Sequence, residues 1–343
     1  MNIVVLAGGL STERDISLSS AFQIHDALID RGHKVVMLDA YLGLTEEIDD
    51  IEKVFSDVKL GAYVIPETPP TLDNIKREKA NTSEGYWGIN VLKICKYADV
   101  VFIALHGADG ENGKVQATFD LLGIAYTGTG YLGSALALNK HLSKQIMEQN
   151  HILTPKWKII NRAKVRDEPK VNLPLVVKPV HEGSSVGVNV AYSIEEYKKA
   201  LAEAFYYGES VLVEEYIEGR EFSVGILRGI PLPPIEIVPN DNFFDYKNKY
   251  QANCTKEICP AVLPIDKTKE IQDIAVKVHH ILQLGTYSRV DFIYKDGAFY
   301  CLEANALPGM TPESLLPKEA LVYGYSFSEL CNELVEGAMK DQQ

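Results

Sequence analysis

The stretch Val176-Val-Lys178-Pro-Val-His-Glu182-Gly183-Ser184-Ser185-Val-Gly187-Val188 decides the fold class of this chain. An apolar strand here delivers a lysine just before a turn rich in glycine and serine. Backbone N–H groups and hydroxyls in such a turn can surround phosphate oxygens while a nearby ammonium neutralises them. No GK[ST] sequence opens a helix, so the turn is not a Walker A loop. A plain hairpin turn is the alternative, but it would not explain Lys178 at the end of an apolar strand.

Two strands nearer the C-terminus carry a second polar cluster, Ser288-Arg289-Val-Asp291-Phe292 and Leu302-Glu303-Ala-Asn305. Side chains two positions apart on a strand share a face, so a hairpin would bring Arg289 together with three oxygen ligands, Asp291, Glu303 and Asn305. Hard oxygen ligands suit Mg²⁺, which binds a few carboxylates plus substrate phosphates. The alternatives are an exposed polar sheet face and, for Arg289, a structural ion pair with Asp291.

Outward from these segments, the hydrophobic pattern predicts an α/β protein. The N-terminal third has buried strands at 3–6, 35–38 and 99–105 and helices at 14–30 and 114–122, as in an open α/β sheet. The middle has a helix at 134–150, strands at 155–160, 175–178 and 211–215, and a helix that begins with a capping box at 193–196. We expect an N-terminal α/β domain over 1–127 and a central domain over 128–214.

The remaining residues, 215–343, are expected to form a C-terminal domain. Its predicted strands lie at 221–227, 235–238, 288–294 and 298–304, and its helices at 266–282 and, after a capping box at 326–329, at 327–339. A polar, aromatic segment from 240 to 259 separates two of these elements. Loops of that length inside compact domains are usually functional or mobile, so we expect one of these roles there.

Composition excludes several classes of function. The chain has 343 residues, 46% of them hydrophobic, and a net charge of −13, which argues against sequence-independent binding to nucleic acid or to an anionic membrane. No apolar stretch approaches the roughly 20 residues of a membrane span, and the N-terminus lacks a signal-peptide pattern. We therefore expect a cytoplasmic protein. Its five cysteines form no CxxC pair and are expected to be reduced thiols.

The segment Gly128-Thr-Gly130-Tyr-Leu-Gly133 matches the GxGxxG pattern of dinucleotide-binding turns. That fingerprint also needs an acidic residue about 20 positions further on, at the end of a second strand. Here those positions lie within the predicted helix that contains Glu148. A tight glycine turn is therefore the better interpretation.

Taken in order, the polar motifs resemble the ATP-grasp superfamily and, more closely, the D-alanine–D-alanine ligase family. The resemblance covers nearly the whole chain. Its motifs are Gly8-Gly-Leu-Ser-Thr-Glu13-Arg-Asp-Ile-Ser17, His106-Gly-Ala-Asp-Gly-Glu-Asn-Gly113, Ser134-Ala-Leu-Ala-Leu-Asn-Lys140, the 178–187 block, Tyr246-Lys-Asn-Lys249-Tyr250, and Glu303-Ala-Asn305 through Pro308-Gly309-Met-Thr-Pro-Glu-Ser314-Leu315. The fold it implies is α+β, an N-terminal α/β domain followed by two ATP-grasp subdomains with ATP between them.

The resemblance implies an ATP site and a metal site. The residues that would bind ATP are Lys140, Lys178, Glu182, Gly183, Ser185, Glu214, Glu215 and Glu221. The two lysines would hold phosphates. Glu214 would face the exocyclic amine of adenine, and Glu221 would face the ribose hydroxyls. Without the resemblance, the lysines would be taken as surface residues and the carboxylates as solvated. Asp291, Glu303 and Asn305 would bind two Mg²⁺ ions, for which Mn²⁺ is a possible substitute.

The implied reaction joins two D-alanines. One D-alanine carboxylate takes the γ-phosphoryl group of ATP, and the amine of the second displaces phosphate. The first substrate would be oriented by Glu13, Ser184 and Tyr250. The transferred phosphate and the later oxyanion would be stabilised by Arg289 and the Gly309 amide. Further contacts to the substrates would come from His106, Lys249, Ser314 and Leu315. Taken alone, Glu13 is equally explained by the helix dipole and His106 by a structural role.

The sequence departs from the family pattern at Asn139, where Asp is usual, at Ala306, where Thr is common, and at 285–288. None of these positions is a proposed phosphate or metal ligand, but they bear on the second substrate. D-alanyl-D-serine formation and ligation of other amino acids therefore stay open, as does a nucleotide-binding regulatory role, although such a protein would be expected to lose Arg289, Glu303 or Asn305. The resemblance also implies a homodimer.

Overall fold

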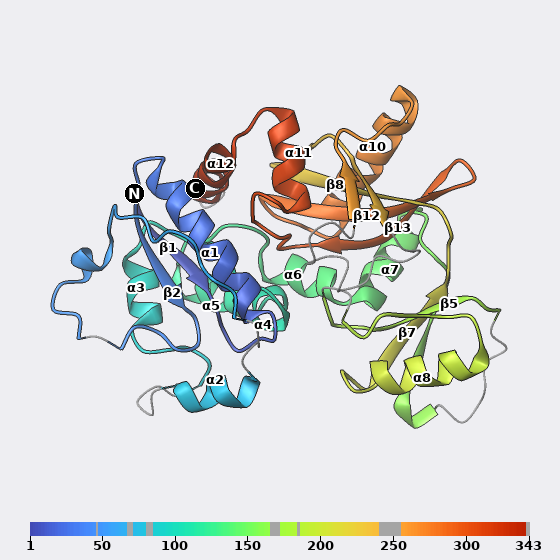
Figure 1. Cartoon of the computed structure of the whole chain (residues 1–343), viewed down its shortest axis with the longest axis horizontal. Helices are drawn as coiled ribbons and strands as arrows, with labels where there is room; N and C mark the ends of the chain where they lie inside the picture. Colours follow the sequence, from blue (N-terminus) through green and yellow to red (C-terminus); the bar gives the residue numbers. More distant parts are fainter. Residues whose placement is uncertain are drawn as a thin grey trace.

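The structure is a computed structural model that describes residues 1–45, 47–66, 71–79, 85–164, 172–183, 186–239 and 255–340. Its strands form three separate sheets, which follow one another along the chain (Figure 1). Within the described residues, no helix has the length and apolar character needed to cross a bilayer.

The N-terminal sheet is parallel and has the strand order β2-β1-β3, with β1 at Asn2–Ala7, β2 at Lys34–Asp39 and β3 at Val100–Ile103. Residues 3–7 of β1 are completely buried, as expected for a central parallel strand covered on both faces. The accompanying helices are α1 (Arg14–Ile29), α2 (Leu72–Glu78), α3 (Val91–Tyr97), α4 (Ala108–Glu111) and α5 (Lys114–Leu122), with a 3₁₀ turn, η1, at Ile51–Val54. The predicted open α/β sheet is confirmed.

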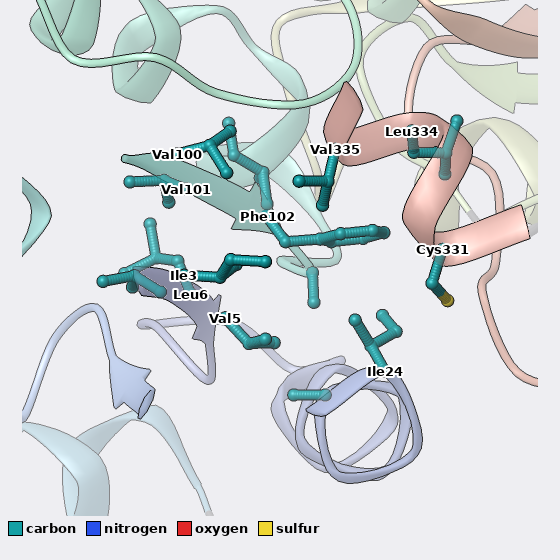
Figure 2. Packing of buried hydrophobic residues seen from close by; sticks show 14 of the residues in the cluster. Ile3, Val5, Leu6, Ile24, Val100, Val101, Phe102, Cys331, Leu334 and Val335 are labelled. Atoms are coloured by element: carbon teal, nitrogen blue, oxygen red, sulfur yellow. The ribbon is translucent and has the colours of Figure 1, made fainter. Parts of the chain in front are cut away.

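The last helix of the chain, α12 (Phe327–Lys340), completes the core of this N-terminal sheet. Its buried residues Cys331, Leu334 and Val335 belong to the same apolar cluster as Phe102 of β3, and Figure 2 shows this helix beside the Phe102 side chain. The predicted capping box opens the helix, because Ser326 N–H donates to Glu329 Oε2 at 2.9 Å and Glu329 N–H donates to Ser326 Oγ at 3.3 Å. The two ends of the chain therefore share one core.

The central sheet is antiparallel, with the order β4-β7-β5-β6. Its strands are β4 (Trp157–Asn161), β5 (Leu175–Pro179), β6 (Asn189–Ala191) and β7 (Ser210–Glu215), and a 3₁₀ turn, η2, occupies Arg162–Lys164. Helix α8 (Ile194–Ala204) covers one face and buries Tyr197 and Leu201 against Val177 and Val211. Ser193 Oγ accepts from Glu196 N–H at 3.1 Å, the predicted N-cap.

The single helix predicted over 134–150 is wrong, because the chain forms two helices there. Helix α6 (Tyr131–Leu138) and helix α7 (Lys140–Gln149) meet at Asn139, whose backbone is extended (φ −82°, ψ 92°). The Asn139 side chain accepts from Leu142 N–H at 3.1 Å and so caps α7. This break places Lys140 at the first position of α7.

The C-terminal sheet is antiparallel, with the order β11-β10-β8-β12-β13, and a short β9 (Ile230–Pro231) beside β8. The strands are β8 (Arg220–Leu227), β10 (Ile235–Pro239), β11 (Thr255–Ile258), β12 (Tyr287–Lys295) and β13 (Ala298–Asn305), and the helices are α10 (Ile265–Ile281) and α11 (Leu315–Tyr323). The loop predicted over 240–259 ends earlier than expected, since residues 255–258 pair with β10. Phe222, Val290 and Phe292 pack with α10 residues in an apolar cluster, which leaves the other sheet face for polar groups.

The glycines of the GxGxxG segment serve close backbone packing. Gly128 has φ +97°, and its carbonyl accepts from Thr286 Oγ1 at 3.3 Å. A Cβ at Gly133 would lie 2.3 Å from the Gln283 carbonyl oxygen. These contacts dock the start of α6 against the turn that follows α10, and only glycine fits such an approach.

Candidate nucleotide and metal site

A cavity of about 740 Å³ lies between the central and the C-terminal sheets. Strands β5 and β7 contribute one side, and β8, β10, β12 and β13 the other. It is lined by many of the predicted site residues, Lys140, Lys178, Glu182, Gly183, Glu214, Glu215, Glu221, Asp291 and Glu303. Residues from both sheets therefore face one space that is large enough for a nucleotide.

Buried lysines and one buried carboxylate form the floor on the β5–β7 side. Lys178 Nζ lies 2.6 Å from Glu214 Oε1, and Lys144 Nζ lies 2.8 Å from Glu214 Oε2. Burial acts to raise the pKa of Glu214, but the ammoniums of Lys144 and Lys178 hold that pKa below its usual value. Burial likewise opposes the charge on Lys178, yet Glu214 and Glu303 raise the pKa of Lys178. Burial lowers the pKa of Lys144, whereas Glu214 acts to raise it.

Lys140 joins the central part to the metal-side hairpin. Its ammonium lies 3.4 Å from Glu303 Oε2 and donates to the Glu182 carbonyl oxygen. The Lys140 side chain is 8% exposed and the Glu303 side chain 27%. Lys140 therefore touches both the phosphate loop predicted at 182–185 and a predicted metal ligand.

The β12–β13 hairpin brings the predicted polar side chains onto one face. Arg289 pairs with Asn305 and Asp291 with Glu303, so these four side chains share one face. Arg289 donates to both Asp291 oxygens at 2.9 Å, and Asn305 Nδ2 donates to Asp291 Oδ2 at 3.0 Å. Burial acts to lower the pKa of Arg289, but Asp291 raises it. The ion pair considered as an alternative is thus present, alongside the predicted cluster.

The hairpin offers a donor set that fits magnesium brought by a nucleotide. Two carboxylates, Asp291 and Glu303, and the amide oxygen of Asn305 belong to neighbouring register positions on the face toward the cavity. Mg²⁺ typically takes one or two carboxylates and completes its shell with phosphate oxygens and water. Within the described ranges, no three His, Cys, Asp or Glu side chains form a metal-binding group by themselves.

The N-terminal part brings carboxylates to the same region. Glu13 is 6% exposed and precedes α1, and Gly107, in the turn after β3, lies beside it: a Cβ there would be 3.2 Å from Glu13 Oε2. Glu111 accepts from Gly107 N–H at 3.2 Å, and its Oε2 would lie 3.4 Å from a Cβ at Gly183 of the phosphate loop. Desolvation and then Glu13 raise the pKa of Glu111 to about 8.

His106 lies on the same turn and is close to α1. Its Nε2 lies 3.5 Å from Ser20 Oγ. Burial lowers the pKa of His106 to about 4, so the imidazole is neutral at physiological pH. A neutral ring is suited to packing and hydrogen bonding beside a substrate rather than to charge pairing.

Helix α11 begins beside Gly309. Ser314 is its N-cap residue and Leu315 its first residue. A Cβ at Gly309 would lie 3.0 Å from Ser314 Oγ, and Thr311 N–H donates to that hydroxyl at 3.1 Å. The predicted oxyanion amide and the predicted carboxylate site are therefore neighbours, and a helix N-terminus favours an anion. Four predicted residues, Ser184, Ser185, Lys249 and Tyr250, lie outside the described residues.

Several cavity residues were missed by sequence reasoning. Tyr192 and Tyr216 line it and form an edge-to-face pair with ring centroids 6.1 Å apart, and Arg220 binds Glu236 through two hydrogen bonds of 2.7 and 2.8 Å. Lys144 was missed because a lysine inside a helical pattern is usually a surface residue. Tyr192 and Tyr216 flank predicted strands, and this position is the sequence feature that could have identified them as cavity residues.

Together, the fold and this cavity define the class of protein, an ATP-grasp protein with an N-terminal α/β domain. Two family models match the chain, "D-ala D-ala ligase N-terminus" over residues 2–129 and "D-ala D-ala ligase C-terminus" over residues 146–336. The D-alanine–D-alanine ligase of Pediococcus pentosaceus is 42% identical over 99% of this chain and 98% of its own length, and that of Lacticaseibacillus casei is 40% identical over 99% and 96%.

Solved structures agree with these matches. The D-alanine–D-alanine ligase of Bacillus anthracis complexed with ATP superposes with a TM-score of 0.77 at 26% identity, covering 100% of this chain and 98% of that one. The VanG D-Ala:D-Ser ligase of Enterococcus faecalis gives 0.75 at 28% identity, covering 98% and 99%. The chain belongs to the D-alanine–D-alanine ligase family, and the predicted family, fold class and enzyme class are confirmed.

Proposed function

We propose that the cavity between the two antiparallel sheets is the site where this D-alanine–D-alanine ligase binds ATP and activates the first D-alanine. One observation carries the proposal: Lys140, Lys178, Asp291 and Glu303, from four different elements, line the same 740 Å³ space. Cations on one side and carboxylates on the other suit a nucleotide whose phosphates travel with divalent metal.

Two groups of lining residues orient the nucleotide, and they meet at the Lys178–Glu214 ion pair. Glu214, Glu215 and Glu221 lie on the strand ends beside Tyr192 and Tyr216, and this aromatic, acidic group takes the adenosine. Lys140 and Lys178 take the phosphates together with the 182–185 loop. Two cations and backbone N–H groups there offset the phosphate charge.

Asp291, Glu303 and Asn305 would hold two Mg²⁺ ions, with Mn²⁺ as a substitute, and the metal would supply positive charge to offset the charge that develops during phosphoryl transfer. Arg289 shares Asp291 with that site at 2.9 Å. Two hydrogen bonds to Asp291 fix the orientation of the Arg289 guanidinium. Its remaining N–H groups are therefore preorganised to donate to the transferred phosphoryl group. The Gly309 amide serves the later oxyanion.

The two D-alanines bind on the side of the cavity nearest the N-terminal part. Glu13, with Ser184 and Tyr250, orients the ammonium of the first, and His106 lies beside it. Lys249, Ser314 and the Leu315 amide receive the carboxylate of the second. Its amine attacks the acyl phosphate carbonyl carbon, phosphate leaves with the bonding electron pair, and the amine loses its proton as the peptide bond forms.

Second-substrate preference is the open part of this function. D-serine is an amine like D-alanine, and the Enterococcus faecalis D-Ala:D-Ser ligase is similar in fold. Discrimination between the two depends on a hydroxyl partner and on pocket volume. The homodimer and the cytoplasmic location stay predictions.

Phosphate release tests the proposal. The protein is incubated with ATP, Mg²⁺ and D-alanine, then with L-alanine, D-serine or D-lactate added, and the products are identified by mass. We expect ADP, phosphate and D-alanyl-D-alanine in equal amounts, and no product from L-alanine alone. ATP binding without phosphate release on addition of D-alanine would contradict the substrate assignment, and Asn139, Ala306 and 285–288 would then be examined first.

A further inference from the structure

Lys144 is a buried ionisable residue that the proposed mechanism does not use. It lies on α7, its side chain is 1% exposed, and three oxygens surround its ammonium. Glu214 Oε2 lies at 2.8 Å, Thr154 Oγ1 at 2.6 Å and the Pro155 carbonyl oxygen at 3.3 Å. The Trp157 ring lies beside it, with its centroid 5.5 Å away.

Protein oxygens surround the Lys144 ammonium, two of them as hydrogen-bond acceptors and Glu214 as its ion-pair partner. An ammonium has three N–H donors and no acceptor, and three oxygens already lie within reach. The Lys144 side chain is closed off from solvent and is not part of the cavity lining, so it does not contact the nucleotide directly. Lys178 differs: within the described ranges, its ammonium has one ion-pair partner, Glu214, so donors remain for phosphate.

Glu214 is the point where the two lysines meet. Lys178 contacts one carboxylate oxygen and Lys144 the other, so the carboxylate plane is fixed from two sides. A carboxylate has about four lone-pair positions, so the remaining ones can still accept from a ligand. A single cation would leave Glu214 free to rotate about its terminal torsion, which is soft for glutamate.

We propose that Lys144 is a positioning residue, which fixes the Glu214 carboxylate as the acceptor for the exocyclic amine of adenine and thereby sets the preference of the enzyme for ATP. The inference rests on the proposed nucleotide site. Lys144 also ties α7 to the chain before β4 through Thr154 and Pro155, so the geometry of the base pocket is coupled to the helix that begins with Lys140.

A purely structural lysine would affect every nucleotide equally, and this separates the two roles. A group that acts through Glu214 should matter only for a base that carries the amine. Purine riboside triphosphate lacks that amine and is otherwise the same as ATP. The informative quantity is therefore the ratio of kcat/KM for ATP to kcat/KM for purine riboside triphosphate, measured by D-alanine-dependent phosphate release.

The central experiment replaces Lys144 by methionine, which has a similar volume. For K144M we expect KM for ATP to rise about tenfold, with a smaller change in kcat, as the loss of one well-placed hydrogen bond implies. The ATP preference should fall by a similar factor, while KM for D-alanine stays unchanged. K158M is the matched control, because Lys158 is an exposed residue of β4, and it should leave all these values at the wild-type level.

A double-mutant cycle locates the effect. E214Q alone should lower the ATP preference, and adding K144M to E214Q should change it no further, since the residue through which Lys144 acts has already been altered. If K144M is too unstable to measure, K144Q keeps an amide donor for the Pro155 carbonyl and removes only the charge. Thermal unfolding of each variant reports the structural contribution separately.

The outcomes are distinct. An unchanged ATP preference in K144M or K144Q, with kcat/KM lowered equally for both nucleotides, would overturn the positioning role and leave the proposed function intact. Additive effects of K144M and E214Q would also overturn it. A wild-type enzyme that ligates D-alanine equally well with both nucleotides would overturn the role of Glu214 and, with it, this inference.

Discussion

The β1 strand and the β12–β13 hairpin show two ways of burying a strand. Residues 3–7 of β1 are apolar and completely buried, so both faces of that strand serve packing (Figure 2). In the hairpin, Val290, Phe292 and Ala304 pack on one face, while Arg289, Asp291 and Asn305 meet on the other. The first pattern stabilises the fold, whereas the second uses the packed face to hold polar groups in register.

Glu303→Gln is the substitution expected to have the largest effect. It removes one negative charge from the proposed metal set but keeps the shape of the side chain, so ligation should fall by about a thousandfold or more. Thermal unfolding should change little, since Glu303 lies on the polar face. Steady-state phosphate release and a melting curve measure both quantities.

The control for this change is Glu203→Gln, an exposed glutamate on α8. It should retain wild-type turnover. Turnover of Glu303→Gln within a factor of three of wild type would remove Glu303 from the metal set, whatever the melting curve shows.

The hairpin was also the part of the site most accessible to sequence reasoning. Alternation predicted that Arg289 and Asp291 share one face of their strand and that Glu303 and Asn305 share one face of theirs. The pairing of Arg289 with Asn305 and of Asp291 with Glu303 came from the structure. The break at Asn139 was not predicted, since asparagine caps a helix only where tertiary contacts favour an end there. The docking of α12 onto β3 and the burial of Lys144 were not predicted either, because periodicity shows that a face is buried and not against which element.

Leu6→Ala tests the packed side of the comparison. Leu6 is completely buried in β1, and deleting a buried leucine side chain leaves a cavity, so the free energy of unfolding should fall by about 2–5 kcal/mol. Leu121→Ala provides a matched control, because Leu121 is 89% exposed and its loss should change stability by less than about 0.5 kcal/mol. Urea denaturation measures both. Equal losses of unfolding free energy in Leu6→Ala and Leu121→Ala would mean that packing in the parallel sheet contributes no more to stability than an exposed side chain does.

Glu319 is an exception to the separation of polar and apolar faces. It lies on α11 and is completely buried, and within the described residues neither carboxylate oxygen has a hydrogen bond of good geometry, although the Gly225 backbone N–H lies close enough to oppose part of the effect of burial on its pKa. A Cβ at Gly225, the register partner of Arg289, would lie 2.5 Å from Glu319 Oε2. Burial raises the pKa of Glu319 well above its usual value.

This raised pKa predicts a pH-dependent stability. Below the ordinary glutamate pKa, folded and unfolded chains both carry the proton, so the group makes no difference there. As the pH rises, the unfolded chain loses the proton first, and stability falls by up to about 1.4 kcal/mol per pH unit until the folded pKa is reached. Glu319→Gln should therefore be more stable than wild type at pH 8 and equal to it near pH 4. Parallel stability curves for the two proteins would contradict this prediction.

Asn139→Asp should have the smallest effect, and it tests what the departure from the family pattern does at the helix break. Aspartate caps a helix as well as asparagine and adds a charge that the N-terminus of α7 favours, a gain of about 0.3–1 kcal/mol.

Asn139 Nδ2 also contacts His181 Nε2 at 3.1 Å, and aspartate would replace that donor with a carboxylate. The new partner should raise the pKa of His181, which burial and Lys140 now lower. The added stability should therefore be larger at pH 5.5 than at pH 8, because it is lost as the pH rises through the folded pKa of the imidazolium. Urea denaturation at the two pH values measures the difference, and an equal gain at both would assign the effect to the helix cap alone.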